Sequence, residues 1–206
     1  MSEDLVAEIK AKISSKADPE AAAKYKRYFR EPIECLGLSS SGIDEVTRMF
    51  YPRVKGNLKL ALEVAGALVR TRVLDNASVG IRLMRRMKRR LTPELFDVFD
   101  GWVDHLTNWA NTDGLRTWLI SETVRLDPSH AERLLEWTGS ENRWRRRAAA
   151  VSLVPIARKG GMLGEAFAIA DRLMTNGEDM VQKGVGLLLK EASKEHPAEV
   201  RSYPLR

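Results

Sequence analysis

Residues 112–138, TDGLRTWLISETVRLDPSHAERLLEWT, decide the fold class. Apolar residues recur there every three or four positions, which is the spacing of an amphipathic helix. Asp127 and Pro128 interrupt the pattern. Aspartate caps free N–H groups and proline fits the first helical turn, so this pair predicts the start of a second helix. We expect two helices, 112–126 and 129–138, joined by a short turn.

The same pattern extends over the whole chain. Segments with Gly, Pro, Asn, Ser or Asp separate apolar helical patterns, and no convincing strand alternation is present. Asp18 before Pro19 and Thr92 before Pro93 are further expected helix starts. The other predicted helices span residues 3–15, 19–30, 42–51, 58–71, 77–89, 93–106, 142–158, 163–175 and 179–195.

The predicted helices pair from residue 42 onward, with a period of roughly 30 to 40 residues that is typical of HEAT-like or armadillo-like repeats. We therefore expect an all-α fold, an α-α superhelix or solenoid of HEAT-like helical repeats with a concave basic face. The chain has 206 residues, of which 44% are hydrophobic, enough for a single domain over residues 1–206.

Composition excludes several classes of protein. Cys35 is the single cysteine of the sequence, which rules out an internal disulfide and every cysteine-based zinc pattern. The three histidines, His105, His130 and His196, form no ligand pair at helical spacing, so we expect no metal and no cofactor. The most apolar run, 60–69, is short and contains Glu63. We expect a cytoplasmic protein without a membrane span.

Two segments combine residue types that suggest chemistry, NWANTD at 108–113 and SENRWRRR at 140–147. Trp109 and Asp113 are four residues apart, so in a helix both project from one face. An indole beside a carboxylate suits a planar, electron-poor group. The arginines suit phosphate, because guanidinium binds phosphate oxygens in bidentate fashion. Together with a net charge of +6, these segments indicate nucleic acid as the partner.

Simpler interpretations compete with this one. Asp113 precedes an apolar run, and local sequence favours it as an ordinary helix N-cap. The cations of residues 82–90 spread around more than one helix face, which favours a solvated surface. Trp102, Trp118 and Trp137 lie among apolar neighbours and are expected in the core.

Several landmarks in one order resemble the AlkD-like DNA alkylation repair enzymes, which are HEAT-repeat DNA glycosylases. The resemblance spans nearly the full length. Its landmarks are residues 26–29 (KRYF), 35–38 (CLGL), 89–96 (RRLTPELF), 102–104 (WVD), 108–113 (NWANTD), Trp137, 142–147 (NRWRRR), 181–187 (VQKGVGL) and 190–191 (KE).

The resemblance implies that Asp113 is the catalytic carboxylate and that Trp109 packs beside the lesion or its sugar. It implies that Arg147 holds the phosphate next to the lesion and that Tyr28 lines the same cleft. The implied reaction is hydrolysis of the N-glycosidic bond of N3- or N7-alkylated purines such as 3-methyladenine and 7-methylguanine in double-stranded DNA, the first step of base excision repair. We expect a monomer that associates with the nucleoid when bound to DNA. The further residues expected to bind DNA or substrate are Arg143, Arg146, Lys183, Leu187 and Lys190.

Two departures separate the chain from that family pattern. Leu187 stands where relatives usually have a tryptophan, and the chain ends at Arg206, short of a further helix expected from the resemblance. Two other functions therefore stay open. One is a non-catalytic relative that binds damaged or branched DNA, and the other is a HEAT-repeat scaffold for protein partners.

Overall fold

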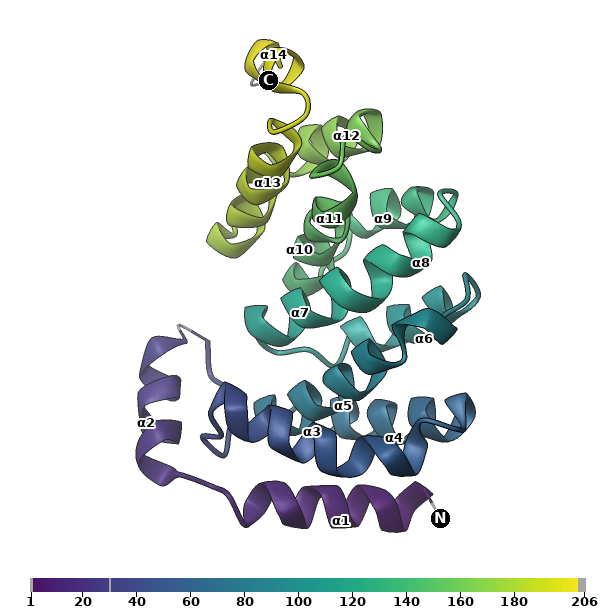
Figure 1. Cartoon of the computed structure of the whole chain (residues 1–206). Helices are drawn as coiled ribbons and strands as arrows, with labels where there is room; N and C mark the ends of the chain where they lie inside the picture. The colour runs from purple at the N-terminus through teal and green to yellow at the C-terminus, as the bar shows by residue number, and fades with distance from the viewer. Residues whose placement is uncertain (1, 30, 204–206) are drawn as a thin grey trace. The chain divides into compact units, whose positions relative to one another are not determined.

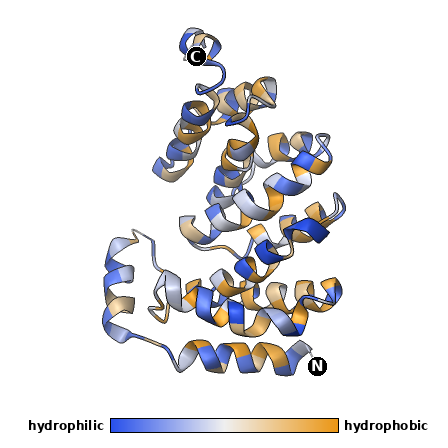
Figure 2. Cartoon of the chain, in the orientation of Figure 1, coloured by the Kyte–Doolittle hydropathy of each residue, from blue (hydrophilic) through white to orange (hydrophobic). Residues whose placement is uncertain are grey.

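The computed structural model describes residues 2–29 and 31–203. Helices joined by short connections make up most of this part of the chain (Figure 1). Extended pairing among the described residues is limited to one parallel bridge between Glu34 and Val73. Hydrophobic and hydrophilic residues are interleaved along the helices, as Figure 2 shows, which confirms the amphipathic pattern. The fold class is all-α, as predicted.

The chain divides into two compact units, and each is described by itself. Unit 1 comprises residues 1–90 and 105–114. Its elements are α1 (Ser2–Ser14), α2 (Pro19–Tyr28), α3 (Ser40–Val54), α4 (Leu58–Arg70), α5 (Leu74–Arg86), the 3-10 turn η1 (Lys88–Arg90) and α7 (Trp109–Leu115), which ends where unit 2 continues. The expectation of a single domain stays a prediction.

Unit 2 comprises residues 91–104 and 115–206. Its elements are α6 (Leu95–Val103), the π-helical segment η2 (Arg116–Ile120), α8 (Ser121–Leu126), α9 (His130–Trp137), α10 (Arg143–Ser152), α11 (Val154–Ala157), α12 (Leu163–Leu173), α13 (Asp179–Ala192) and α14 (Pro197–Ser202).

Each unit has its own hydrophobic core. In unit 1, α1, α3, α4 and α5 pack together and bury large aliphatic side chains such as Ile9, Val46 and Leu68. Gly80 of α5 permits a close approach to α4, because a Cβ there would lie 2.8 Å from the carbonyl oxygen of Ala65. In unit 2, the buried aromatic and aliphatic residues include Phe96, Phe99, Trp102, Leu119, Leu134, Trp137, Trp144, Val151, Ile169 and Leu188.

Local capping signals are confirmed at one predicted start and wrong at another. Asp18 accepts a hydrogen bond from the backbone N–H of Ala21 at 2.9 Å, with Pro19 in the first turn of α2. Thr92 does not cap the helix predicted for 93–106. That helix begins at Leu95 because the backbone first forms a turn, in which the N–H of Leu95 donates to the carbonyl of Thr92.

One boundary error concerns the helix predicted for 112–126. It begins at Trp109 instead, because the side chain of Asn108 accepts a hydrogen bond from the backbone N–H of Asn111 at 2.9 Å. The interpretation of Asp113 as an N-cap is therefore wrong, since Asp113 lies inside α7. The helix predicted for 142–158 is also divided, into α10 and α11, near Pro155, which has no N–H to donate.

The core tryptophans are confirmed in two of three cases. Trp102 and Trp137 are buried, whereas Trp118 is half-buried. Trp118 belongs to the π-helical segment η2, where one extra residue per turn displaces the apolar stripe that ordinary helical spacing predicts. The buried residues of that segment are Arg116, Leu119 and Ile120.

The C-terminal end of the described chain carries one short helix, α14, that the sequence pattern did not predict. His196 precedes it and its Nε2 lies 3.0 Å from the carbonyl oxygen of Gly160. This hydrogen bond raises the pKa of His196 above its ordinary value, and Glu199, 3.6 Å from Nδ1, raises it further against the opposing effect of partial burial. Arg30, the predicted last residue of the helix 19–30, and Arg206, the last residue of the chain, lie outside the described residues.

We expect His196 to make stability pH-dependent. Because its folded-state pKa is raised, its contribution is fully present below about pH 6.5 and is lost as the pH rises through the folded-state value. Thermal unfolding of wild type and His196→Gln should therefore differ more at about pH 5.5 than at about pH 8.5. A difference in Tm that stays constant over this range would contradict the assigned role.

Candidate functional site

A shallow pocket with aromatic walls lies within unit 1, with a volume of about 220 Å³. It is formed by the C-terminal end of α2, the start of α3, α5 from Leu74 to Arg82 and the first turn of α7. The residues that line it are Tyr25, Tyr28, Phe29, Leu38, Ser40, Ile43, Leu74, Ser78, Arg82, Trp109 and Ala110. It contains two of the residues that the sequence singled out, Tyr28 and Trp109.

Three aromatic rings meet in this pocket. The rings of Phe29 and Trp109 are stacked, with centroids 5.5 Å apart and an interplanar angle of 28°. The ring of Tyr28 meets Trp109 edge-on at 6.3 Å and is 68% exposed, while Phe29 is buried. Phe29 therefore supports Trp109 from inside, and Tyr28 stands at the rim. The half-buried Trp109 and the exposed Tyr28 offer flat apolar surface to a planar ligand.

Asp113 belongs to the same helix as Trp109. The two residues are four positions apart in α7, so both side chains project from one face of the helix, as the spacing predicted. Asp113 is half-buried. A carboxylate and an indole are thus held at a fixed separation by one turn of backbone.

The loop after α2 holds Tyr28 and Phe29 in place through Asp75. The carboxylate of Asp75 is fully buried and accepts hydrogen bonds from the backbone N–H groups of Leu36 at 2.5 Å and Leu38 at 2.9 Å. The N–H of Leu74 also donates to the carbonyl of Glu34 at 2.8 Å. The start of α5 is therefore tied to the segment that follows α2.

Gly37 allows the same loop to approach α2. Its φ of +86° lies in the left-handed region, and a Cβ at this position would lie 2.2 Å from the carbonyl oxygen of Asp18. This tether matters because α2 has no buried residue between Pro19 and Tyr28. The loop at Gly37 thus lies directly against the N-terminal half of α2, at Asp18 and Ala22.

The other wall of the pocket is fastened to α5 by Asn111. Its Nδ2 donates to the carbonyl oxygen of Leu74 at 3.1 Å, and its Oδ1 lies 3.4 Å from the hydroxyl of Ser78. Asn111 is buried, so these bonds satisfy polar groups that water does not reach. The N-terminal turn of α5 thus positions both aromatic walls, one through Asp75 and one through Asn111.

One cation lies in the pocket wall. Arg82 donates to the carbonyl oxygen of Ser40 at 2.9 Å and to its hydroxyl at 3.0 Å, and it forms an ion pair with Asp44 at 2.6 Å. These contacts hold the guanidinium at the start of α3. The pocket therefore combines aromatic surface with an oriented guanidinium that is paired with Asp44.

The remaining predicted site residues belong to unit 2, where α10 packs against α13. Arg147 is buried, and its Nη1 donates to the carbonyl oxygen of Met180. Arg146 donates to the carbonyl oxygens of Ser140 and Glu141 at 2.6 and 2.9 Å. In both cases the guanidinium binds backbone carbonyl groups.

Arg143 is more accessible. It lies 4.9 Å from the ring centroid of Trp144 and forms an ion pair with Glu178 at 3.4 Å. On α13, Lys183 is exposed and pairs with Asp179 at 2.8 Å, Lys190 is exposed, and Leu187 is half-buried. The convergence of Arg147 with Trp109 and Asp113 stays a prediction.

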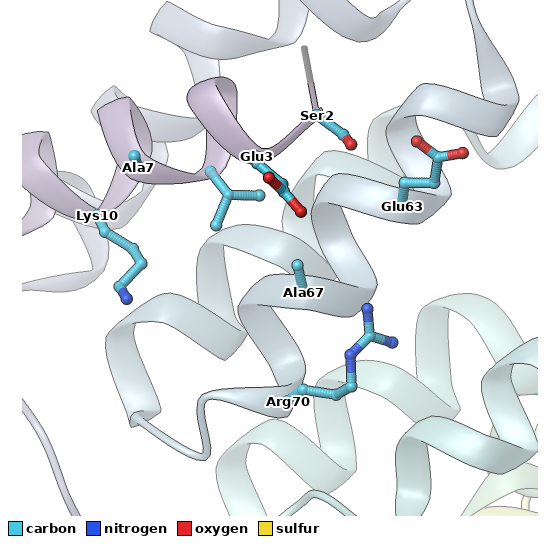
Figure 3. Close-up of a pocket in the computed structure, with 8 residues that line it drawn as sticks. Ser2, Glu3, Ala7, Lys10, Glu63, Ala67 and Arg70 are labelled. Atoms are coloured by element: carbon cyan, nitrogen blue, oxygen red, sulfur yellow. The ribbon is translucent and has the colours of Figure 1, made fainter.

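A larger cavity of about 460 Å³ lies elsewhere in unit 1, between α1 and α4. Figure 3 shows that acidic and basic side chains border it together, among them Glu3, Lys10, Glu63 and Arg70. No aromatic residue lines it. It offers no flat surface for a base, so the smaller aromatic pocket is the candidate site.

The comparison with known families agrees with the landmarks in the sequence. A family model described as DNA alkylation repair enzyme matches residues 9–203. The chain belongs to the DNA alkylation repair enzyme family. Its fold is also similar to that of a solved structure, described as a predicted DNA alkylation repair enzyme from Enterococcus faecalis. The TM-score is 0.81 at 19% sequence identity, over 91% of this chain and 88% of that chain. No curated protein matches this member of the family.

Within residues 2–29 and 31–203, no group of three or more His, Cys, Asp or Glu side chains is arranged to hold a metal ion. Across the same described ranges, no helix has both the length and the hydropathy needed to cross a bilayer.

Sequence reasoning missed three residues that shape the pocket, namely Phe29, Asp75 and Arg82. Phe29 stands in a quoted landmark, but its stacking on Trp109 joins helices that are far apart in sequence. Asp75 lies next to the predicted start of helix 77–89, where an acidic residue reads as an ordinary helix-start residue. Only its burial identifies it as the acceptor for a distant loop.

We expect Asp75→Ala to destabilise the protein by about 2–5 kcal/mol, because it leaves two backbone N–H groups of the loop without their acceptor. Asp75→Asn keeps one acceptor oxygen and should cost less. Urea unfolding measures both losses, with Glu63→Ala on the exposed face of α4 as the control, expected within about 0.5 kcal/mol of wild type. A loss for Asp75→Ala as small as the control would show that the loop does not depend on this carboxylate.

Proposed function

We propose that this chain is a monofunctional DNA glycosylase, which hydrolyses the N-glycosidic bond of N3- or N7-alkylated purines in double-stranded DNA. The observation that carries the proposal is the arrangement of α7, with Trp109 in an aromatic pocket and Asp113 on the same helix face. Membership of a DNA alkylation repair family supplies the class of substrate. The proposed setting is the cytoplasm, with the enzyme acting as a monomer at the nucleoid.

The aromatic rings suit the charge of such a lesion. A purine alkylated at N3 or N7 carries a positive charge, and a cation is attracted to the face of an aromatic ring. Trp109 and Tyr28 present such surface, while Phe29 keeps the indole in place. An uncharged normal purine gains less from the same rings, which favours the damaged base.

The chemistry required of the protein is modest because the leaving group is already activated. The alkylated purine departs with the electron pair of the glycosidic bond, and the sugar develops oxocarbenium character. The carboxylate of Asp113 stabilises that positive charge electrostatically. It also orients a water molecule and accepts its proton as the oxygen bonds to the anomeric carbon. The products are the free base and an abasic site.

We expect Asp113→Asn to lower the single-turnover rate of base release by at least about 10-fold, with little change in affinity for DNA, since it removes a charge that acts on the transition state. The assay is alkaline strand cleavage of a duplex that contains one 7-methylguanine. Asp97→Asn, an exposed aspartate on α6, serves as the control. Equal losses of affinity and rate in Asp113→Asn would instead indicate a structural aspartate.

The leucine at position 187 favours one other function, a relative that binds damaged DNA without cleaving it. If an aromatic ring at this position stacks on DNA, its absence weakens the contact by about 1–3 kcal/mol. We expect Leu187→Trp to raise affinity or the rate of base release by roughly 5- to 150-fold, the factor that corresponds to that free energy. Leu187→Met, which changes shape little and adds no ring, is the matched control.

Base release should separate the two functions. The non-catalytic relative would be favoured by two results together. Wild type would bind the lesion duplex with strong salt dependence and yield no abasic site, whereas Leu187→Trp, assayed separately, would release the base. Binding that ignores competitor DNA would favour a protein-interaction scaffold instead.

A further inference from the structure

The aromatic pocket continues into a row of cations along α5. Leu74, Ser78 and Arg82 line the pocket at intervals of four residues, and Arg85 follows three residues later. Residues at these intervals share one face of a helix. Arg85 is exposed. The face of α5 that forms the pocket at its N-terminal half is therefore cationic at its C-terminal half.

The positive row extends beyond the end of the helix. Lys88, Arg89 and Arg90 form the 3-10 turn η1, and all three are exposed. Between Asp75 and Glu94 the sequence contains no acidic residue. This segment without acidic residues carries six cations, Arg82, Arg85, Arg86, Lys88, Arg89 and Arg90.

Helix α3 runs beside this row in the same direction. Ser40 contacts Arg82, the hydroxyl of Tyr51 donates to the carbonyl oxygen of Arg86 at 3.2 Å, and Arg90 donates to the carbonyl oxygen of Lys55 at 2.7 Å. The guanidinium of Arg86 also lies over the ring of Tyr51, 4.9 Å from its centroid. These contacts fix the backbone of α5 and η1 against α3.

The charges that face the row from α3 are balanced or positive. Asp44 is paired with Arg82, and Glu45 is paired with Lys16 at 2.8 Å. Arg48 is exposed and lies one turn after Asp44, on the side of α3 that contacts α5. The row is thus bordered by a further cation and by acids that already have partners.

We propose that this face of α5, with η1, binds the sugar–phosphate backbone of DNA leading away from the aromatic pocket, through the exposed Arg85 and Arg89. The inference rests on the proposed function and extends it to a second contact surface. Guanidinium groups bind phosphodiester oxygens without reading sequence. Continuity with a pocket whose rings can stack on a base favours nucleic acid over an acidic protein.

The length of the row fits a short run of duplex. At 1.5 Å per residue, Ser78 and Arg89 are separated by about 16 Å along the axis. Phosphates of one strand follow at about 3.4 Å along the axis of the duplex, so the row spans roughly five base pairs. The surface therefore contacts the backbone several nucleotides away from the base in the pocket.

The test is the salt dependence of binding to an undamaged duplex of about 20 base pairs, measured by fluorescence anisotropy. The double variant Arg85→Gln/Arg89→Gln should reduce the magnitude of the slope of log Kobs against log salt by about 1.8, since each phosphate contact contributes about 0.9. The single variant Arg89→Gln, located in the turn after the helix, should give about half of that change.

The control is Lys10→Gln/Lys59→Gln, which removes the same charge from α1 and α4, helices that do not line the pocket. It should leave the slope unchanged. Equal slopes for wild type and both arginine variants, or equal effects of the arginine and lysine pairs, would overturn the proposal. So would a polyglutamate probe that binds as tightly as DNA and with the same dependence on Arg85 and Arg89.

The assay contains no lesion and needs no turnover. The two proposals can therefore fail separately. Absence of base release by wild type, in the alkaline-cleavage assay, would count against the glycosylase. A reduced salt slope in the arginine variants would still support the DNA-binding face of α5. An unchanged slope alongside normal base release would reject that face and leave the glycosylase standing.

Discussion

The candidate site depends on a buried carboxylate that makes no contact with the pocket itself. Asp75 accepts two backbone N–H groups from the loop that follows α2, at the point where α5 begins. Because α2 buries no residue between Pro19 and Tyr28, this loop decides where Tyr28 and Phe29 lie. A charged acceptor is suited to the task, since hydrogen bonds to a buried anion are stronger than those between neutral groups. The aromatic pocket therefore combines backbone anchoring with side-chain packing, since Phe29 also belongs to a buried cluster with Ile33 and Cys35.

The arginines of unit 2 show how much structural work a basic segment performs. Arg147 and Arg146 bind backbone carbonyl groups, and Arg145 forms ion pairs with Asp100 and Asp104. These partners fix the guanidinium groups, which donate to backbone carbonyl oxygens in the first turn of α13 and in the loop before α10. A run of arginines in sequence thus includes several with structural partners inside the protein. On α5 and η1, Arg82 and Arg90 likewise bind backbone carbonyl groups, whereas Arg85 and Arg89 are exposed on a face that continues from the pocket.

Membership of a DNA alkylation repair family and the aromatic pocket support the proposed reaction from independent directions. The family indicates damaged DNA, and the pocket offers rings that suit a cationic base. Leu187 modifies this picture at one position, since it offers an aliphatic surface where a ring is expected to stack. The role proposed for Asp113 does not involve Leu187, which belongs to a different helix.

The sequence by itself determined the all-α class, the cap at Asp18 and the shared face of Trp109 and Asp113. Each of these depends on residues within one or two helical turns, and helical periodicity and capping encode such local relations directly. The tertiary structure decided that Phe29 stacks on Trp109 and that Asp75 anchors a loop more than thirty residues away. Those contacts depend on which helix faces meet, and periodicity shows that a face is apolar without showing its partner. The start of α7 at Trp109 lies between the two cases, since Asn108 was a visible capping residue whose effect emerged only with the hydrogen bond to Asn111.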